Sequence, residues 1–390
     1  MALPDPKQLG SSGQPLAANC VLPRNSMETT IAHIWQDLLK VDHVSIHDNF
    51  FDLGGHSLLA VRVLTRIERA FDVRLPLTSF LHSATIAQLA ELVDSREDEA
   101  CSWSPLVAIQ TKGTKTPFFG IHPVGGGVLF WKDIVKYMPN DQPFYAIQAQ
   151  GVDGMRPALH RIEDMAGLYI TEIRKVQPHG PYYLGGYSLG GEIAFEMAQQ
   201  LSRAGEKVDL LVLFDTRNPV RAIRPVRVDG NTVLPVLDAQ LPASGYELLK
   251  IKVGGHYWRI RQFKPLKAIK YVAKLIIFHT KYVIISFIAQ LFRVLQKRLP
   301  DGLLLQYLRT TYAMALRNYV PTIYQGKVTL FHASESKKTN PIDSPMGWGP
   351  LANGGLDVHY FDTPHTMIQP EYAEQIARKL NECLLSAGIE

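Results

Sequence analysis

Cysteine is scarce in this sequence. Only three of the 390 residues are cysteines, Cys20, Cys101 and Cys383, and they are spread over the whole length. An odd number at such wide spacing excludes a disulfide framework, and the short Cys and His spacings of a zinc site are missing. We therefore expect no metal and a reducing, cytoplasmic setting.

The sequence also lacks an uninterrupted hydrophobic segment of membrane length. The N-terminal MALPDPKQLGSSGQPLA has no apolar core and is neither a signal peptide nor an anchor. The longest apolar run, 282–292, is too short to span a bilayer and is flanked by Lys281 and Arg293. With 46% hydrophobic and 20% charged residues, the chain is expected to be soluble and to hold two domains of unequal size.

The sequence does contain a candidate nucleophile. Residues 186–190 read Gly-Tyr-Ser-Leu-Gly, after a short apolar run and before a helix-forming run. A Gly-x-Ser-x-Gly motif between a strand and a helix is the setting of a nucleophile elbow, in which small neighbours relieve a strained turn. Ser188 is the candidate, although the motif alone fits a structural turn equally well.

A glycine-rich turn supplies a candidate oxyanion hole. The apolar run 117–121 leads into His-Pro-Val-Gly-Gly-Gly. In α/β-hydrolases one backbone N–H of the hole comes from this position and the other from the residue after the nucleophile. This rule selects Val124 and Leu189. A P-loop is excluded because the Gly-Lys-Ser/Thr ending is missing, and His122 is expected to be structural.

The candidate acid is Asp215. It ends the apolar run 208–214, which predicts a buried parallel strand with the carboxylate at its carboxyl end, where open α/β sheets place their sites. Capping of the next element is a structural alternative. Asp343, after the expected strand 327–333, is a rival because many α/β-hydrolases carry the acid after the next strand.

The candidate base is His365. It lies in the loop after the expected strand 356–361, whereas His332 and His359 lie inside strands. The chain order Ser, Asp, His is that of the α/β-hydrolase triad.

A second serine lies in residues 48–59, Asp-Asn-Phe-Phe-Asp-Leu-Gly-Gly-His-Ser-Leu-Leu. Ser57 follows two glycines at the start of an expected helix, 58–71, so that a phosphodiester on it would meet the free N–H groups of the helix end. Capping of the helix by an unmodified serine is the alternative. Helical patterns from residue 26 and over 85–93 complete a small helical domain.

This run resembles the signature of the peptidyl carrier domains of nonribosomal peptide synthetases over about residues 22–95. The resemblance implies an all-α four-helix bundle and a 4'-phosphopantetheine arm on Ser57, attached by a phosphopantetheinyl transferase. His56 would shape a surface that partners recognise.

The rest of the chain, 105–390, resembles the type I thioesterase domains that end nonribosomal peptide and polyketide assembly lines. The likeness rests on Ile121-His122-Pro123, the serine motif, Leu213-Phe214-Asp215 and Pro364-His365, and it is poor in the middle of the domain. It implies a multidomain chain in which the carrier precedes an α/β-hydrolase fold. Linkers are expected at 1–21 and 96–104, and a long helical lid at about 217–320.

The two resemblances together imply a terminal module that moves a peptidyl or acyl chain from Ser57 to Ser188 and releases it by hydrolysis or macrocyclisation. Upstream condensation and adenylation domains would be partners. Transfer to an external hydroxyl or amine, a polyketide-type carrier–thioesterase, and a non-enzymatic docking module are the alternatives. The Met1 start fits an excised didomain or a free-standing protein.

Acidic residues are scarce in the expected lid. Residues 217–325 hold 18 Lys and Arg against 4 Asp and Glu, a net charge of +14 in a chain of +5. Lys267, Lys270, Lys274 and Lys281 share one helical face. The simpler interpretation is a solvated face of a lid helix, and the alternative is attraction of an anionic partner, either the carrier or an acidic or lipid-linked substrate. Nucleic-acid binding is not expected, because no aromatic and basic residues alternate on a recognisable module.

Overall fold

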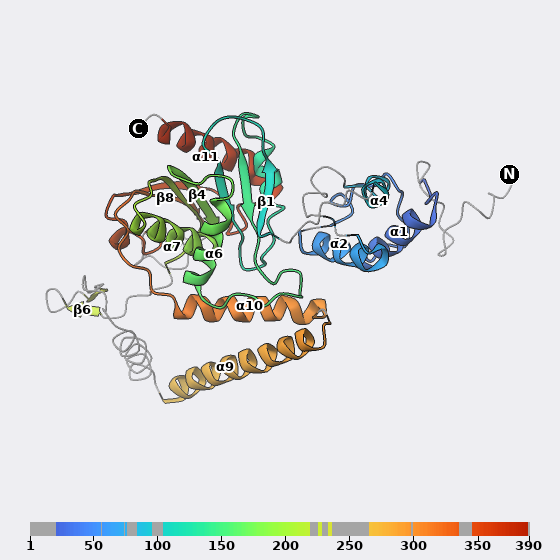
Figure 1. Ribbon diagram of the computed structural model, residues 1–390. Helices are drawn as coiled ribbons and strands as arrows, with labels where there is room; N and C mark the ends of the chain where they lie inside the picture. Colours follow the sequence, from blue (N-terminus) through green and yellow to red (C-terminus); the bar gives the residue numbers. More distant parts are fainter. Residues whose placement is uncertain are drawn as a thin grey trace, which may run out of the picture.

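The computed structural model describes residues 21–55, 57–73, 75, 84–95, 104–218, 225–227, 233–235, 265–297, 299–334 and 345–388. Figure 1 shows a small helical part at the N-terminal end beside a larger part built on a sheet. Before residue 96 the described residues form three helices, α1 (Ser26–Leu39), α2 (Ser57–Phe71) and α4 (Ile86–Asp94). Residues 76–83 lie outside the described residues, so the expected four-helix bundle is described only in part.

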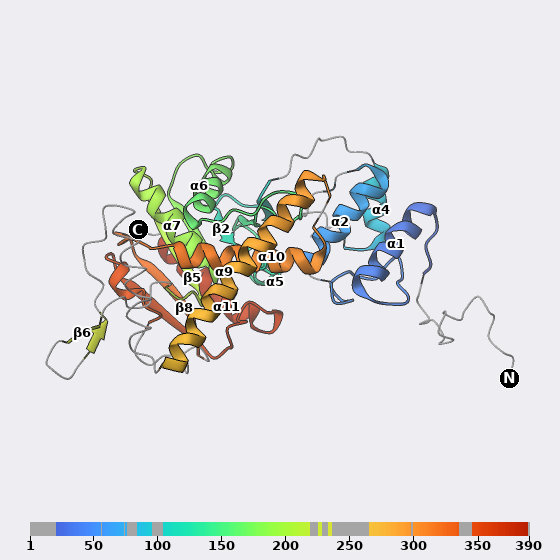
Figure 2. The same ribbon diagram turned by 90° about the horizontal axis from the view of Figure 1, so that it is seen from below.

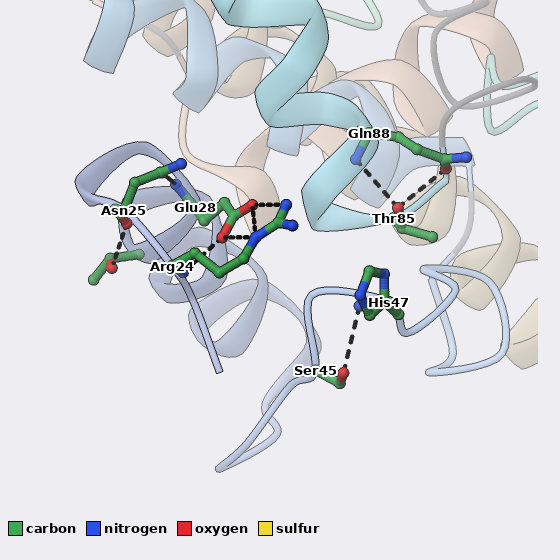
Figure 3. A network of polar contacts seen from close by, with 8 residues as sticks. Arg24, Asn25, Glu28, Ser45, His47, Thr85 and Gln88 are labelled. Carbon is green, nitrogen blue, oxygen red and sulfur yellow. Dashed lines mark hydrogen bonds and ion pairs between the residues drawn. The ribbon is translucent and has the colours of Figure 1, made fainter. Parts of the chain in front are cut away.

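Side-chain caps fix where the first and last of these helices begin. Asn25 accepts a hydrogen bond from the backbone N–H of Glu28 at 2.8 Å, and Thr85 caps α4 in the same way through Gln88. The buried Glu28 carboxylate is paired with Arg24 at 2.5 Å (Figure 3). This hydrogen bond lowers the pKa of Glu28, which therefore stays ionised although it is buried.

The glycines before α2 hold the signature loop against the core of the helical part. Phe50 is fully buried, and its ring lies 5.0 Å from that of Trp35 in an edge-on contact. A Cβ on Gly55 would overlap the Phe50 ring, and Gly54 has a φ of 88°, which few other residues adopt. The loop is thus fixed by packing, and Ser57 is the first residue of the helix that follows.

The larger part is built on a sheet whose seven strands follow the order β1-β3-β2-β4-β5-β8-β9. β1 pairs antiparallel with β3, and every other neighbouring pair is parallel. This is the mixed sheet of an α/β-hydrolase fold, as the sequence predicted. The strands are β1 (Leu106–Gln110), β2 (Phe118–Ile121), β3 (Phe144–Ile147), β4 (Tyr182–Tyr187), β5 (Val208–Phe214), β8 (Val328–Ala333) and β9 (Leu356–Phe361), with a separate hairpin of β6 (Pro225–Arg227) and β7 (Val233–Pro235).

Helices cover both faces of the sheet. α5 (Trp131–Val135) and α11 (Ala373–Ala387) share one core with the side chains of Phe118, Phe144 and Phe214. α6 (Ile162–Ile173) and α7 (Leu189–Arg203) share the other core with the opposite side chains of the same strands. Because both faces are buried, the central strands are largely apolar, and β4 is buried at all of its positions.

Two long helices occupy the region expected to be a lid, α9 (Pro265–Val294) and α10 (Asp301–Asn318). α10 packs on the α6–α7 side of the sheet, and α9 lies outside it (Figures 1 and 2). The apolar run 282–292 is part of a longer stretch, because α9 continues through the single charges that interrupt it. Within the described residues, 269–294 is the one stretch long and apolar enough to cross a membrane.

Candidate active site

Ser188 occupies a strained turn between β4 and α7. Its φ of 53° and ψ of −119° are unusual for a residue with a side chain. The neighbouring glycines explain how the turn closes. A Cβ on Gly186 would overlap the carbonyl of Gly190, and a Cβ on Gly190 would lie 2.7 Å from the carbonyl oxygens of Ile121 and His122. The serine motif therefore packs directly on the end of β2 without room for larger side chains.

The predicted oxyanion donors come from two segments that touch. β2 and β4 are parallel neighbours, and the turn after β2 is closed by a 2.8 Å hydrogen bond from the Gly126 N–H to the Pro123 carbonyl. Val124 lies inside this turn, and Leu189 is the first residue of α7, where the first backbone N–H groups have no partner within the helix. Their role in binding an oxyanion stays a prediction.

His122 is structural, as expected. It is fully buried, and burial lowers its pKa to about 4, so the ring is neutral. Its Nδ1 lies 2.8 Å from the Pro123 carbonyl, which can only accept, and Nδ1 therefore carries the proton. Nε2 then accepts from the Tyr169 hydroxyl at 2.6 Å. Both ring nitrogens are used to hold the end of β2, and none is left for catalysis.

Asp215 and His365, which are 150 residues apart in the chain, are in direct contact. Asp215 follows β5 and is buried, and its Oδ2 accepts from His365 Nδ1 at 2.5 Å. Its Oδ1 accepts from the Ala333 N–H at 3.0 Å. With Nδ1 donating, Nε2 of His365 is the nitrogen that can take up a proton, and the side chain is 52% exposed.

The backbone of Ser188 is hydrogen-bonded to the two residues that flank Asp215 in the chain. Its N–H donates to the Phe214 carbonyl at 3.0 Å, and its carbonyl accepts from the Thr216 hydroxyl at 3.0 Å. The structure thus places the predicted nucleophile, acid and base at the carboxyl edge of neighbouring strands. The rival acid, Asp343, lies outside the described residues.

Three further side chains support this edge and were missed by the sequence analysis. Tyr187 donates from its hydroxyl to the His365 carbonyl at 2.7 Å, and the two rings lie 5.3 Å apart. His332 Nδ1 lies 3.6 Å from Asp215 Oδ1, and the buried Trp348 donates to the Thr216 carbonyl at 2.8 Å. No local signal reveals them, since Tyr187 is a variable position of the motif and the other two are distant in the chain.

The loop that carries the carrier signature contacts the sheet-containing part of the molecule through a lysine of α5. Lys132 of α5 places its Nζ 4.8 Å above the ring of Phe51, which follows Phe50 in the signature loop. Ser57 begins α2, whereas its side chain and all of His56 lie outside the described residues. Among the described residues, no group of three or more His, Cys, Asp and Glu side chains could hold a metal ion.

A buried carboxyl on α7 gives a prediction for stability. Glu192 is 5% exposed, and burial raises its pKa to about 8. The folded chain therefore keeps a proton that the unfolded chain releases above about pH 4.5, and stability falls as pH rises between these two values. Between about pH 5 and about pH 8, the free energy of unfolding should fall by less in Glu192→Gln than in the wild type, with a difference on the order of 3 kcal/mol. Urea titrations measure it, and Glu374→Gln, at an exposed position of α11, is the control. An unchanged pH profile in Glu192→Gln would show that this carboxyl is ionised in the fold.

Comparisons with known proteins match two families to two different parts of the chain. Residues 29–93 match the phosphopantetheine attachment site family, and residues 116–239 match the thioesterase domain family. The malpibaldin synthetase of Mortierella alpina is 30% identical over 98% of this chain, and the dimodular nonribosomal peptide synthase of Bacillus subtilis (strain 168) is 33% identical over 92%. The chain spans 6% and 14% of the lengths of these relatives.

A solved structure shows the same fold. The crystal structure of a holo four-domain nonribosomal peptide synthetase bound to AMP and glycine superposes with a TM-score of 0.52 at 24% identity. The match covers 94% of this chain and 27% of that one. With both family matches in this order and an α/β-hydrolase sheet behind the helical part, the chain carries a phosphopantetheine attachment domain followed by a thioesterase domain.

Proposed function

We propose that this didomain releases a peptidyl or acyl chain from its carrier by transfer to Ser188. The observation that carries the proposal is the 2.5 Å hydrogen bond between His365 and the buried Asp215 beside the strained turn of Ser188. A buried carboxylate, an oriented imidazole and a partly exposed serine at an elbow are the parts of an acyl-transfer triad.

Ser57 fits the attachment of 4'-phosphopantetheine. It is the first residue of a 15-residue helix, and the loop before it is fixed by the packing of Gly55 on Phe50. The first N–H groups of α2 have no partner within the helix and would hydrogen-bond to phosphate oxygens. When bound, the cofactor supplies the thiol that holds the acyl chain as a thioester.

In the first half of the reaction, the Ser188 hydroxyl attacks the thioester carbonyl while its proton passes to Nε2 of His365. The N–H groups of Val124 and Leu189 stabilise the oxyanion, and Asp215 holds the imidazole with Nδ1 protonated. The C–S bond then breaks, and His365 returns the proton to the departing thiolate. An ester of Ser188 and a free thiol remain.

In the second half, water or a hydroxyl or amine of the same chain attacks the ester. His365 takes a proton from the attacking group and returns it to the Ser188 oxygen as the C–O bond breaks. The product is a free acid, a lactone or a lactam. Exclusion of water and folding of the chain over the site decide among them.

Mass spectrometry of the intact protein tests the proposal. The apo didomain is loaded from an acyl-coenzyme A by a phosphopantetheinyl transferase, and the acyl group is followed on Ser57, on Ser188 and in the released product. We expect the group to pass from Ser57 to Ser188 and to leave as acid or ring, and Ser57→Ala should take up no label. An acyl group that stays on Ser57 with several donors, and leaves only when an external amine or alcohol is added, would favour the acyltransferase. One that never leaves would favour a docking module.

A further inference from the structure

The outer side of α9 exposes many large apolar side chains. Nine large apolar residues of this helix are exposed, and Phe287, Ile277 and Val283 reach 69%, 66% and 63% exposure. Contiguous apolar patches of this kind mark contact with another surface. We call them the outer face of α9, which consists of Ile269, Val272, Ile276, Ile277, Val283, Ile284, Phe287, Leu291 and Val294.

The opposite side of the same helix is already occupied. Ile285 and Ala289 are buried against α10, and the guanidinium of Arg317 on α10 lies 3.8 Å from the ring centre of Phe278. At 3.6 residues per turn, the outer face lies on the other side of the helix axis from these contacts. Figure 1 shows α9 at the margin of the molecule with α10 between it and the sheet.

The charge around the outer face is of one sign. Lys270, Lys274 and Lys281 are exposed, and their positions fall within about 40° of one another around the helix, along one border of the outer face. Residues 248–300 contain no Asp or Glu. A second copy of this helix would bring like charges together, whereas an anionic surface complements them.

A bilayer-spanning position is excluded by α10. A spanning helix needs lipid or apolar protein on every side, but α9 is joined at its C-terminal end to α10, which carries the exposed Arg309 and Arg317. An apolar face bordered by lysines on a helix backed by protein is the arrangement of a helix that lies in the membrane interface.

We propose that the outer face of α9 docks the didomain on an anionic lipid surface. The helix lies parallel to the membrane with Phe287 and the neighbouring aliphatic side chains among the acyl chains. The three lysines lie at the level of the headgroup phosphates and carboxylates. Docking through this face leaves α10 between the lipid surface and the sheet.

Flotation of the full-length protein with vesicles of phosphatidylcholine mixed with phosphatidylserine is the test. We expect the wild type to float with these vesicles and Leu291→Glu to bind about tenfold or more weakly. Leu385→Glu is a matched control, because that leucine is 51% exposed on α11 while Leu291 is 46% exposed. Equal thermal midpoints of the two variants show that folding is unaffected.

The lysines give an independent readout. Changing Lys270, Lys274 and Lys281 to Gln should weaken binding to the anionic vesicles by roughly fivefold per lysine and should reduce its salt dependence. Wild-type protein that does not float, or binding that Leu291→Glu leaves unchanged, would overturn the proposal. So would a dimer in lipid-free solution that Leu291→Glu dissociates, since the face would then belong to a second copy.

Discussion

Ser188→Ala is expected to lower the rate of chain release by at least about 10⁴-fold. The acyl-enzyme cannot form without the hydroxyl, and the oxyanion hole alone accelerates attack by water only weakly. The acyl group should therefore remain on Ser57, and a fluorophosphonate should no longer label the protein. The fold should not change, because alanine and serine tolerate a φ of 53° about equally and the backbone hydrogen bonds of this position remain.

The control for this variant is Ser334→Ala. Ser334 follows β8 and donates to Asp362 at 2.8 Å. Its loss should leave release within about twofold of the wild type. If Ser188→Ala retained the wild-type rate with an unchanged thermal midpoint, another group would be the nucleophile.

The parts of this site that depend on short sequence spacing could be predicted. The strand, turn and helix around Ser188 are dictated by glycines within two residues of it, and β5 ends in the apolar run 210–214, directly before Asp215. The same holds for Ser57, since Gly55, which packs on Phe50, lies two residues before it in the chain. In each case the physical cause lies within a few residues of its effect.

The contacts across the sheet could not be predicted. Tyr187 meets the backbone of His365 across 178 residues, and His332 approaches Asp215 only because β8 is the strand next to β5. Strand order decides such contacts, and a single sequence does not contain it. Chain order alone therefore left the choice between Asp215 and Asp343 open.

The exposed face of α9 was missed for a different reason. Helical periodicity separates the lysines from the aliphatic residues, and the usual inference is that the aliphatic side is buried. α9 is apolar on two sides, and α10 is wide enough to cover only one of them. Periodicity reports which residues share a side and gives no information on how many partners that helix has.

Asp215→Asn is expected to lower kcat for release by about 10⁴-fold while leaving the fold intact. The amide oxygen can still accept the Ala333 N–H, but its NH₂ would face Nδ1 of His365 and donate to it. The imidazole would then carry its proton on Nε2, facing Ser188, and could not act as a base. An Asp215→Ala variant would instead also lose stability, because the Ala333 N–H would be buried without a partner.

Two variants show whether this effect belongs to Asp215 alone. Asp362→Asn changes a carboxylate three residues from His365 that pairs with Ser334, and it should leave kcat within about twofold. Asp343→Asn tests the rival acid under the same assay. A large loss in Asp343→Asn together with a small one in Asp215→Asn would transfer the orienting role to Asp343, and the 2.5 Å contact of Asp215 with His365 would then be structural. A large loss in Asp215→Asn together with a small one in Asp343→Asn would show that Asp215, which follows β5, fixes the tautomer of His365 and so allows it to act as the general base.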